Sequence, residues 1–196
     1  MNYLAHTHLS FGRPAWVAGN FLADALRGKQ AFEALPEAVR QGVLLHRAID
    51  RFTDGHPLVR EGVALLREGH GKYAGVVLDV LYDHYLARHW DRFSETDLHG
   101  FSLQAYEAYR DHAHLMPGPV WERLQRMIAH NWLTGYDSVE SLQFVFSRMA
   151  ERAAFPNRFH EAHEDLQRHG PELQEAFLDF YPQLFAHAQA FAESEL

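Results

Sequence analysis

Hydrophobic residues recur along this chain with the spacing of amphipathic helices almost throughout. Apolar positions return every three to four residues, and no segment shows the strict alternation or the Asn-Gly turn of a β-hairpin. Prolines and glycines mark where the helices should begin and end. The pattern predicts helices over residues 15–27, 36–53, 58–68, 73–91, 94–115, 120–133, 139–153, 158–169 and 171–195.

Two of these helices open on capping patterns, in which an acidic residue follows a polar residue by three positions. Ser94 with Asp97 and Asp137 with Glu140 fit this description. No repeat, low-complexity tract or linker separates the elements. The sequence therefore predicts one all-α domain over residues 1–196, built as a multi-helix bundle.

Composition narrows the chemistry that such a bundle can perform. The chain has 196 residues and no cysteine, which excludes disulfides, thiolate nucleophiles and cysteine-based metal sites. It opens without the pattern of a secretory signal, and its best apolar stretch, residues 74–86, is interrupted by acidic and histidine side chains. We therefore expect a cytoplasmic protein with no membrane partner.

Charge is distributed unevenly between the two halves of the chain. Residues 1–92 carry 11 Lys and Arg against 10 Asp and Glu, whereas residues 93–196 carry 7 against 16, and the net charge is −8. An acidic chain argues against nucleic acid as a partner. Either the first half presents a basic face to an acidic partner, or one half of the surface is simply more acidic.

The first candidate site lies on the predicted helix 36–53. His46 and Asp50 are four residues apart and share a helix face, with Asp54 one turn further on. Histidine and aspartate at this spacing can bind one divalent metal. The alternative is an ion pair on the helix surface, which would contribute little.

The strongest signal lies on the predicted helix 73–91. This segment is apolar on all sides except for Asp79, Asp83 and His84, which is typical of a buried helix. Two carboxylates one turn apart in such surroundings need a common cation, because an unpaired buried charge would destabilise the fold. That cation is either an arginine or a metal.

A third cluster lies on the predicted helix 15–27, where Asn20 and Asp24 are four residues apart. Gly19 would let another backbone approach closely. These polar residues could equally make a buried contact between helices. Nearer the start, His6 and His8 would point in opposite directions on an extended chain, so at most one faces a site, and His6 is the preferred candidate.

The chain contains 15 histidines, and most of them lie in polar segments that indicate solvated helices, as at His160 and His163. Other chemistries lack their motifs. There is no G-x-S-x-G nucleophile elbow, residues 69–73 lack the spacing of a Walker motif, and no glutamate precedes a histidine by three residues as in di-iron bundles.

Several of these stretches resemble one known family over essentially the whole chain. The family is that of the acyl carrier protein phosphodiesterases, a divergent branch of the HD-type metal phosphohydrolases, which this chain resembles. The matching stretches are residues 1–6, 19–24, 46–50 with 53–54, 78–86 and 88–90, and a late Phe180-Tyr181-Pro182. Typical HD enzymes carry a His-Asp doublet, whereas here the adjacent pair is Asp83-His84 in reversed order. The resemblance implies an HD-like bundle.

The resemblance also implies hydrolysis of the phosphodiester that joins 4′-phosphopantetheine to a serine of holo-acyl carrier protein, with Mn²⁺ or Mg²⁺ as cofactor. A bound divalent cation suits this reaction, because it polarises the phosphoryl oxygen and lowers the pKa of water. On this basis we expect Asp24, His46, Asp50 and Asp83 to bind the metal. Asp79 would be a further ligand or the base, and His84 or His6 would assist the leaving oxygen.

Acyl carrier proteins are acidic, which would give the basic residues of the first half a role. The proposed site is flanked by Arg27, Lys29, Arg40, Arg47, Arg51 and Arg60, and the foremost candidates for docking are Arg27, Lys29, Arg47 and Arg51.

Two rival functions remain. The first is an HD-type phosphohydrolase acting on a nucleotide or another small phosphodiester. The second is a non-catalytic helical binding protein, in which arginine pairs with the buried carboxylates.

Overall fold

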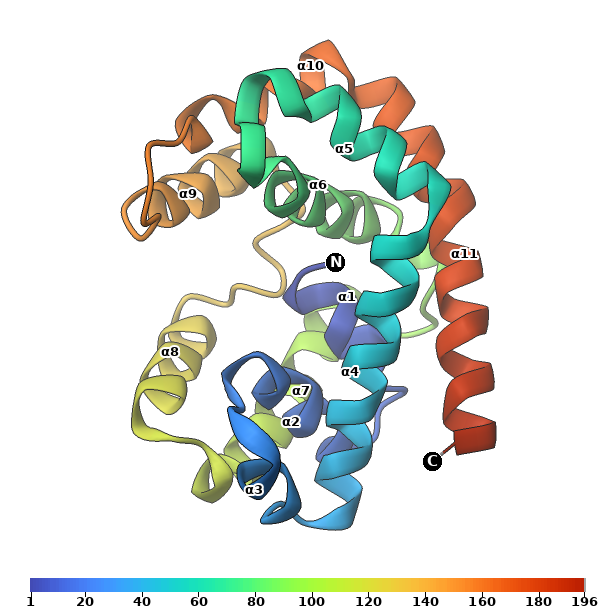
Figure 1. Cartoon of the computed structure of the whole chain (residues 1–196), viewed down its shortest axis with the longest axis vertical. Coiled ribbons are helices and arrows are strands. Elements are labelled where there is room, and N and C mark those ends of the chain that lie inside the picture. Colours follow the sequence, from blue (N-terminus) through green and yellow to red (C-terminus); the bar gives the residue numbers. More distant parts are fainter. Residues whose placement is uncertain (196) are drawn as a thin grey trace.

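The computed structural model describes residues 1–195, which contain helices and no β-strand (Figure 1). The α-helices are α1 (Tyr3–His8), α2 (Pro14–Leu22), α3 (Gly28–Glu33), α4 (Glu37–Gly55), α5 (Pro57–His70), α6 (Ala74–Arg88), α7 (Leu98–Asp111), α8 (Gly118–Ala129), α9 (Val139–Ala150), α10 (Asp165–Arg168) and α11 (Gly170–Glu195). Short 3-10 turns join several of them: η1 (Ala23–Ala25), η2 (Gly71–Tyr73), η3 (Trp90–Arg92), η4 (Ala113–Leu115) and η5 (Phe159–Glu164). The predicted all-α class is confirmed. The HD-like architecture stays a prediction, as does the single domain, whose last residue lies outside the described ones.

Helix boundaries differ from the predicted ones where local chemistry competes with the hydrophobic pattern. The predicted helix 15–27 ends at Leu22, and Gly28 begins α3 at a φ of 81° instead of ending the preceding helix. The Asp97 side chain accepts a hydrogen bond from the Gly100 N–H, so the N-cap of α7 is Asp97, three residues after the predicted Ser94. Residues 158–169 form η5 and α10 instead of one long helix.

The short helix α1 was not predicted, because its six residues are too few to show a period. The Asn2 side chain caps it by accepting a hydrogen bond from the Tyr3 N–H. Residues two apart on a helix point about 200° from each other, nearly as far apart as on a strand. His6 and His8 therefore still face opposite sides, as expected, although the backbone is helical.

Two glycines bring α2 and α4 into backbone contact. A Cβ added at Gly19 would lie 2.0 Å from the Val39 carbonyl oxygen, and one at Gly42 would lie 2.4 Å from the Trp16 carbonyl oxygen. No other residue fits at either position without separating the helices. The close approach predicted at Gly19 is confirmed, and it places the polar residues of α2 beside those of α4.

The helices enclose one hydrophobic core, with α6 near its centre. Of the α6 side chains, Leu78, Leu81 and Asp83 are fully buried, as the apolar pattern of this segment predicts. Figure 1 shows α4 and α11 along one side of the molecule, with α9 and α8 on the other and α1 between them. Within residues 1–195, no helix has the length and apolar character needed to cross a membrane.

Candidate metal centre

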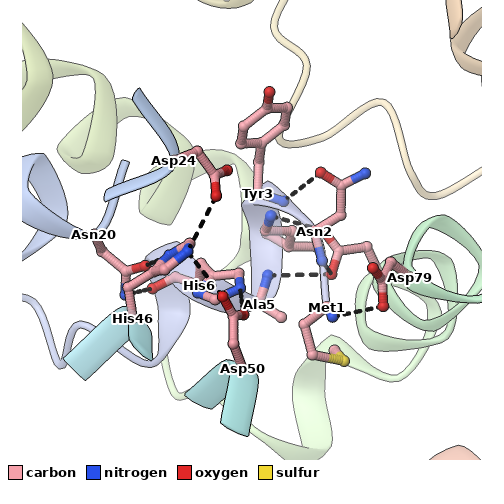
Figure 2. Close-up of polar contacts among 12 residues, drawn as sticks. Met1, Asn2, Tyr3, Ala5, His6, Asn20, Asp24, His46, Asp50 and Asp79 are labelled. Atoms are coloured by element: carbon pink, nitrogen blue, oxygen red, sulfur yellow. Dashed lines mark hydrogen bonds and ion pairs between the residues drawn. The ribbon is translucent and has the colours of Figure 1, made fainter. Parts of the chain in front are cut away.

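Three side chains from two helices converge at one end of a cavity. His6 of α1 and His46 and Asp50 of α4 each direct a ligand atom to one point, with these atoms all within 4.8 Å of one another. The two imidazole rings are stacked with centroids 4.3 Å apart. His6 Nε2 lies 3.2 Å from Asp50 Oδ1, and His46 Nε2 lies 3.0 Å from Asp50 Oδ2, as Figure 2 shows.

A fourth side chain, Asp24, reaches this cluster from the turn η1. Its Oδ1 atom lies 3.2 Å from His46 Nε2, so this nitrogen faces two carboxylates. The side chains of Asp24 and Asp50 are 61% and 46% exposed, whereas that of His46 is only 9% exposed. The structure thus brings together Asp24, His46 and Asp50, as predicted, and adds His6 to them.

The orientation of the His46 ring is fixed by Asn20 of α2. The Asn20 amide nitrogen donates hydrogen bonds to the His6 carbonyl oxygen at 2.9 Å and to the Ser10 hydroxyl at 3.2 Å. Its oxygen must therefore accept from His46 Nδ1, 2.8 Å away. Because Nδ1 carries this proton, Nε2 of the neutral ring presents a lone pair to the two carboxylates.

The pKa values in the cluster reflect this concentration of hydrogen-bond acceptors. Burial disfavours a charged ring at His46, but hydrogen bonds to Asp24 and Asp50 raise its pKa to about 9. Burial would raise the pKa of Asp50, yet hydrogen bonds with His46 and His6 hold it well below its usual value. The hydrogen bond with His46 likewise lowers the pKa of Asp24, whereas burial lowers that of His6. The geometry therefore demands a positive charge at His46 Nε2, supplied by a proton or a metal ion.

These residues fit a divalent cation. Two imidazole nitrogens and two half-exposed carboxylates form a mixed nitrogen and oxygen donor set of the kind that binds first-row divalent metals. Asn20 supplies the contact to the second ring nitrogen that metal-binding histidines ordinarily have. His6 Nδ1 is buried without a hydrogen-bond partner in the described part of the chain, so the polar contact of this ring is made by Nε2, which faces Asp50.

The carboxylates of α6 lie elsewhere, at the start of the chain. Asp83 accepts hydrogen bonds from the backbone N–H groups of Asn2, Leu4 and Ala5, with the shortest, to Leu4, at 2.7 Å. Asp79 Oδ1 lies 2.7 Å from the Met1 amino group. Burial raises the pKa of Asp83 to about 7, against the opposing effects of that amino group and the three N–H donors. The structure does not bring Asp83 into the His6–His46–Asp50 cluster, and Asp79 lines the same cavity without belonging to that cluster.

His84, expected as a catalytic residue, lies away from the cavity. Its Nδ1 atom is 2.6 Å from the Tyr136 carbonyl oxygen, and burial lowers its pKa. Asp54, one turn beyond Asp50 on α4, lines the cavity wall with an exposed side chain. His8 contacts the Tyr181 hydroxyl at 2.7 Å and the Phe93 carbonyl oxygen at 3.1 Å, on the side of α1 away from the cluster.

The four foremost docking candidates, Arg27, Lys29, Arg47 and Arg51, are exposed and do not line the cavity. Arg47 and Arg51 lie one turn apart on α4, next in sequence to His46 and Asp50. Arg27 donates hydrogen bonds to the Asp24 and Leu26 carbonyl oxygens, and Lys29 pairs with Glu33 at 3.4 Å. Arg40 is partly buried and Arg60 is exposed, and both donate to backbone carbonyl oxygens, those of Glu33 and Asp54.

The cavity has a volume of about 430 Å³ and extends from the cluster to α9. No residue of its far wall was predicted from the sequence to belong to a site, and this wall consists of Phe144, Val145, Arg148, Met149 and Arg152. An available signal was the i, i+3, i+4, i+7 spacing of residues 145, 148, 149 and 152, which places them on one helix face.

Comparison with known proteins gives one consistent result. A sequence model of the family "Acyl carrier protein phosphodiesterase" matches residues 1–184. A protein of that name from Serratia proteamaculans is 37% identical over 191 residues, which is 96% of this chain and 98% of the relative. Two others, from Salmonella dublin and Salmonella agona, are 36% identical over 194 residues, covering 96% of this chain and 97% of each relative. No solved structure matches the chain significantly.

Proposed function

The chain belongs to the acyl carrier protein phosphodiesterase family, and from this premise we propose that it is a phosphoric diester hydrolase acting on holo-acyl carrier protein. The bond cleaved is the phosphodiester between 4′-phosphopantetheine and a carrier serine. Apo-carrier and free phosphopantetheine are the products. We place the reaction at the His6–His46–Asp50 cluster. A cytoplasmic location, expected from the sequence, is part of the same proposal.

One observation carries the placement of the reaction. His46 Nε2 faces the carboxylates of Asp24 and Asp50 at 3.2 and 3.0 Å, while Asn20 holds the proton of the ring on the opposite nitrogen. The lone pair of His46 Nε2 and the two carboxylates are three acceptors that face one another, and this arrangement is unfavourable unless a cation lies between them. A surface ion pair needs no such locked tautomer, so this arrangement favours a metal site.

We propose Mn²⁺ as the resident ion, with Mg²⁺ as a substitute. Imidazole donors at His6 and His46 favour Mn²⁺, because Mg²⁺ prefers oxygen ligands and near-ideal octahedral geometry. Asp50 would supply the carboxylate between the two rings, and Asp24 would complete the set from η1. Asn20 would orient His46 without touching the ion.

The chemistry divides between the ion and the chain. A bound divalent cation would polarise the phosphodiester and lower the pKa of a bound water molecule to near neutrality. The chain would bind and orient the substrate and restrict solvent at the buried His6 and His46 side of the cluster. Of His84 and His6, the two histidines expected to assist the leaving serine oxygen, only His6 lies at the cluster, where its Nε2 would be a ligand of the ion.

The protein part of the substrate would dock on the basic residues around the cluster. Arg27, Lys29, Arg47 and Arg51 are exposed beside it, and opposite charges at an interface mainly raise the rate of association. Association should therefore slow several-fold when salt rises from about 0.05 to 0.3 M, since exposed charges are screened over about 10 Å at 0.1 M. Stopped-flow binding of holo-carrier measures this effect, and a rate independent of salt would contradict the docking surface.

The function itself is tested by mass spectrometry of holo-acyl carrier protein incubated with this protein, with Mn²⁺ or with a chelator. We expect loss of the phosphopantetheine mass only when Mn²⁺ is present. Loss with the chelator would remove the metal from the proposal. No loss in either condition, together with turnover of a small chromogenic phosphodiester, would favour the small-substrate phosphohydrolase instead.

A further inference from the structure

Helix α9 forms the wall of the cavity opposite the metal cluster. Its two faces have different surroundings: Leu142 and Phe146 are fully buried in the core, whereas the face that carries Val145 and Arg148 lines the cavity. The turn after the helix continues this second face with Arg152. In Figure 1, α9 lies on the side of the molecule opposite α4 and α11. A substrate bound at the cluster would therefore lie against this wall.

The wall carries positive charge with little compensation. Arg148 pairs with Glu151 at 2.7 Å, but Arg152 makes no hydrogen bond or ion pair within residues 1–195. Arg152, Tyr3 and Asp24 all line the cavity. Figure 2 shows Tyr3 next to Asp24 at the edge of the cluster. The unpaired cation therefore faces the same cavity as the cluster.

The same wall also exposes apolar side chains. Phe144 on α9 is 54% exposed and Val76 on α6 is 40% exposed, and both line the cavity with Val145 and Met149. Apolar surface gathered at the rim of a polar cavity is typical of a binding site, because leaving it in water is unfavourable. The wall thus combines an anion-binding group with an apolar strip.

We propose that α9 is the recognition wall for the prosthetic group: Arg152 binds a non-bridging oxygen of the phosphodiester, and Phe144 packs against the pantetheine arm. This inference rests on the proposed function and adds to it the residues that distinguish the substrate. Phosphopantetheine matches the wall chemically, since it joins an anionic phosphate to a long arm with a branched apolar segment. A guanidinium suits phosphate because it donates two hydrogen bonds in a fixed plane.

Equilibrium binding tests the wall separately from turnover. Titration of the Mn²⁺-loaded protein with 4′-phosphopantetheine or with inorganic phosphate, followed by calorimetry, gives the affinity of each probe. We expect Arg152→Gln to weaken the binding of both probes by about tenfold or more, since hydrogen bonds between charged groups are stronger than those between neutral ones. Arg152→Lys should recover part of the loss, because it keeps the charge without the planar fork.

Phe144→Ala should weaken phosphopantetheine about three- to tenfold and leave the affinity for inorganic phosphate within twofold, because phosphate has no arm. Two matched controls lie on α7, outside the cavity: Arg110→Gln for the charge and Leu103→Ala, at 50% exposure, for the apolar surface. Both should bind the two probes as the wild-type protein does.

Apo-carrier, which lacks the phosphate, separates this wall from a docking surface. If Arg152→Gln weakened apo-carrier binding but not phosphopantetheine binding, the assignment to the prosthetic group would be overturned. Wild-type affinity for both small probes in Arg152→Gln and Phe144→Ala would overturn it as well. Failure of the proposed function would look different: the wild-type protein would leave holo-carrier intact whatever these variants bind.

Discussion

Two pairs of carboxylates face different partners in this molecule. Asp24 and Asp50 are half-exposed at the cavity and face imidazole nitrogens, which in the neutral state are acceptors like themselves. Asp79 and Asp83 on α6 face donors, namely the Met1 amino group and three backbone N–H groups of α1. The first pair calls for a positive charge at His46, supplied by a proton or by the metal ion proposed above, whereas the chain itself satisfies the second. A carboxylate indicates a metal only when its neighbours cannot donate hydrogen bonds.

The largest effect should come from removing a carboxylate of the first pair. We expect Asp50→Ala to lower the turnover of holo-carrier at least about 1,000-fold, because it removes a ligand located between two imidazoles. The free energy of unfolding should change by less than about 1 kcal/mol, since the side chain is half-exposed. Mass spectrometry of the carrier and thermal unfolding measure the two quantities. Wild-type turnover would contradict the placement of the reaction.

The matching change in the second pair should act on stability instead. Asp83→Ala removes the only side chain that accepts from Asn2, Leu4 and Ala5 within the described residues, so three buried or partly buried donors lose their partner. We expect a loss of about 3–5 kcal/mol in the free energy of unfolding, by the usual effect of breaking a buried polar network. Denaturant unfolding measures it. An Asp83→Ala protein as stable as wild type, with turnover abolished, would return Asp83 to the metal site.

The two pairs should also respond differently to pH. Burial raises the pKa of Asp83 to about 7 in the folded chain, above a value near 4 when unfolded. The stability linked to its proton is full below pH 4 and is lost as the pH rises through 7. The difference between wild type and Asp83→Asn, both free of metal, should therefore change by about 2–4 kcal/mol between pH 4 and 8.

His46 titrates in both proteins, so it cancels in that difference. Asp24 and Asp50 have lowered pKa values, so their contribution is lost only when the pH falls below about 4, outside the window measured. Denaturant unfolding at several pH values gives the comparison. A difference that stays constant across the window would show that Asp83 is ionised throughout it.

A smaller effect, on metal affinity, is expected from Asn20, which contacts His46 on the ring nitrogen opposite the first pair. Asn20→Ala frees the His46 ring from its fixed tautomer, and the loss of such a supporting contact typically weakens metal binding about 10–100-fold. Ser10→Ala is the matched control, because Ser10 contacts Asn20 without contacting His46, and it should have a clearly smaller effect. Calorimetric titration with Mn²⁺ measures both. Equal affinities in all three proteins would show that Asn20 does not orient a metal ligand.

Much of the fold and part of the site could be predicted from periodicity. Helix phase alone placed His46 and Asp50 on one face of α4, and the buried character of α6 followed from its apolar neighbours. What remained open was which elements meet. A buried carboxylate such as Asp83 needs donors, but sequence does not reveal whether they belong to a side chain, a metal or the backbone of a distant segment.

The unpredicted helix α1 shows why the remainder was missed. Its six residues make too short a helix to form alone in water, since isolated helices shorter than about 12 residues are marginal. The Asn2 side chain caps this helix, and the Asp83 carboxylate, about 80 residues away, accepts a hydrogen bond from its Leu4 N–H. These two contacts hold the helix in place. The α9 wall was missed for a related reason. Its two arginines can be recognised as site residues only because they line the same cavity as the cluster, and the sequence does not show that α9 and α4 lie across from each other.

The glycine contact between α2 and α4 has a consequence for the order in which the molecule is assembled. Trp16 and Gly42 are 26 positions apart in a chain of 196 residues, and contacts between nearby segments form early in folding because closing a short loop loses less entropy than closing a long one. Asp24, His46 and Asp50 should therefore come together while the rest of the chain is still unstructured. His6 must wait for α6, which emerges later during synthesis. We expect the incomplete site to be present on the ribosome before the helix that completes it has docked.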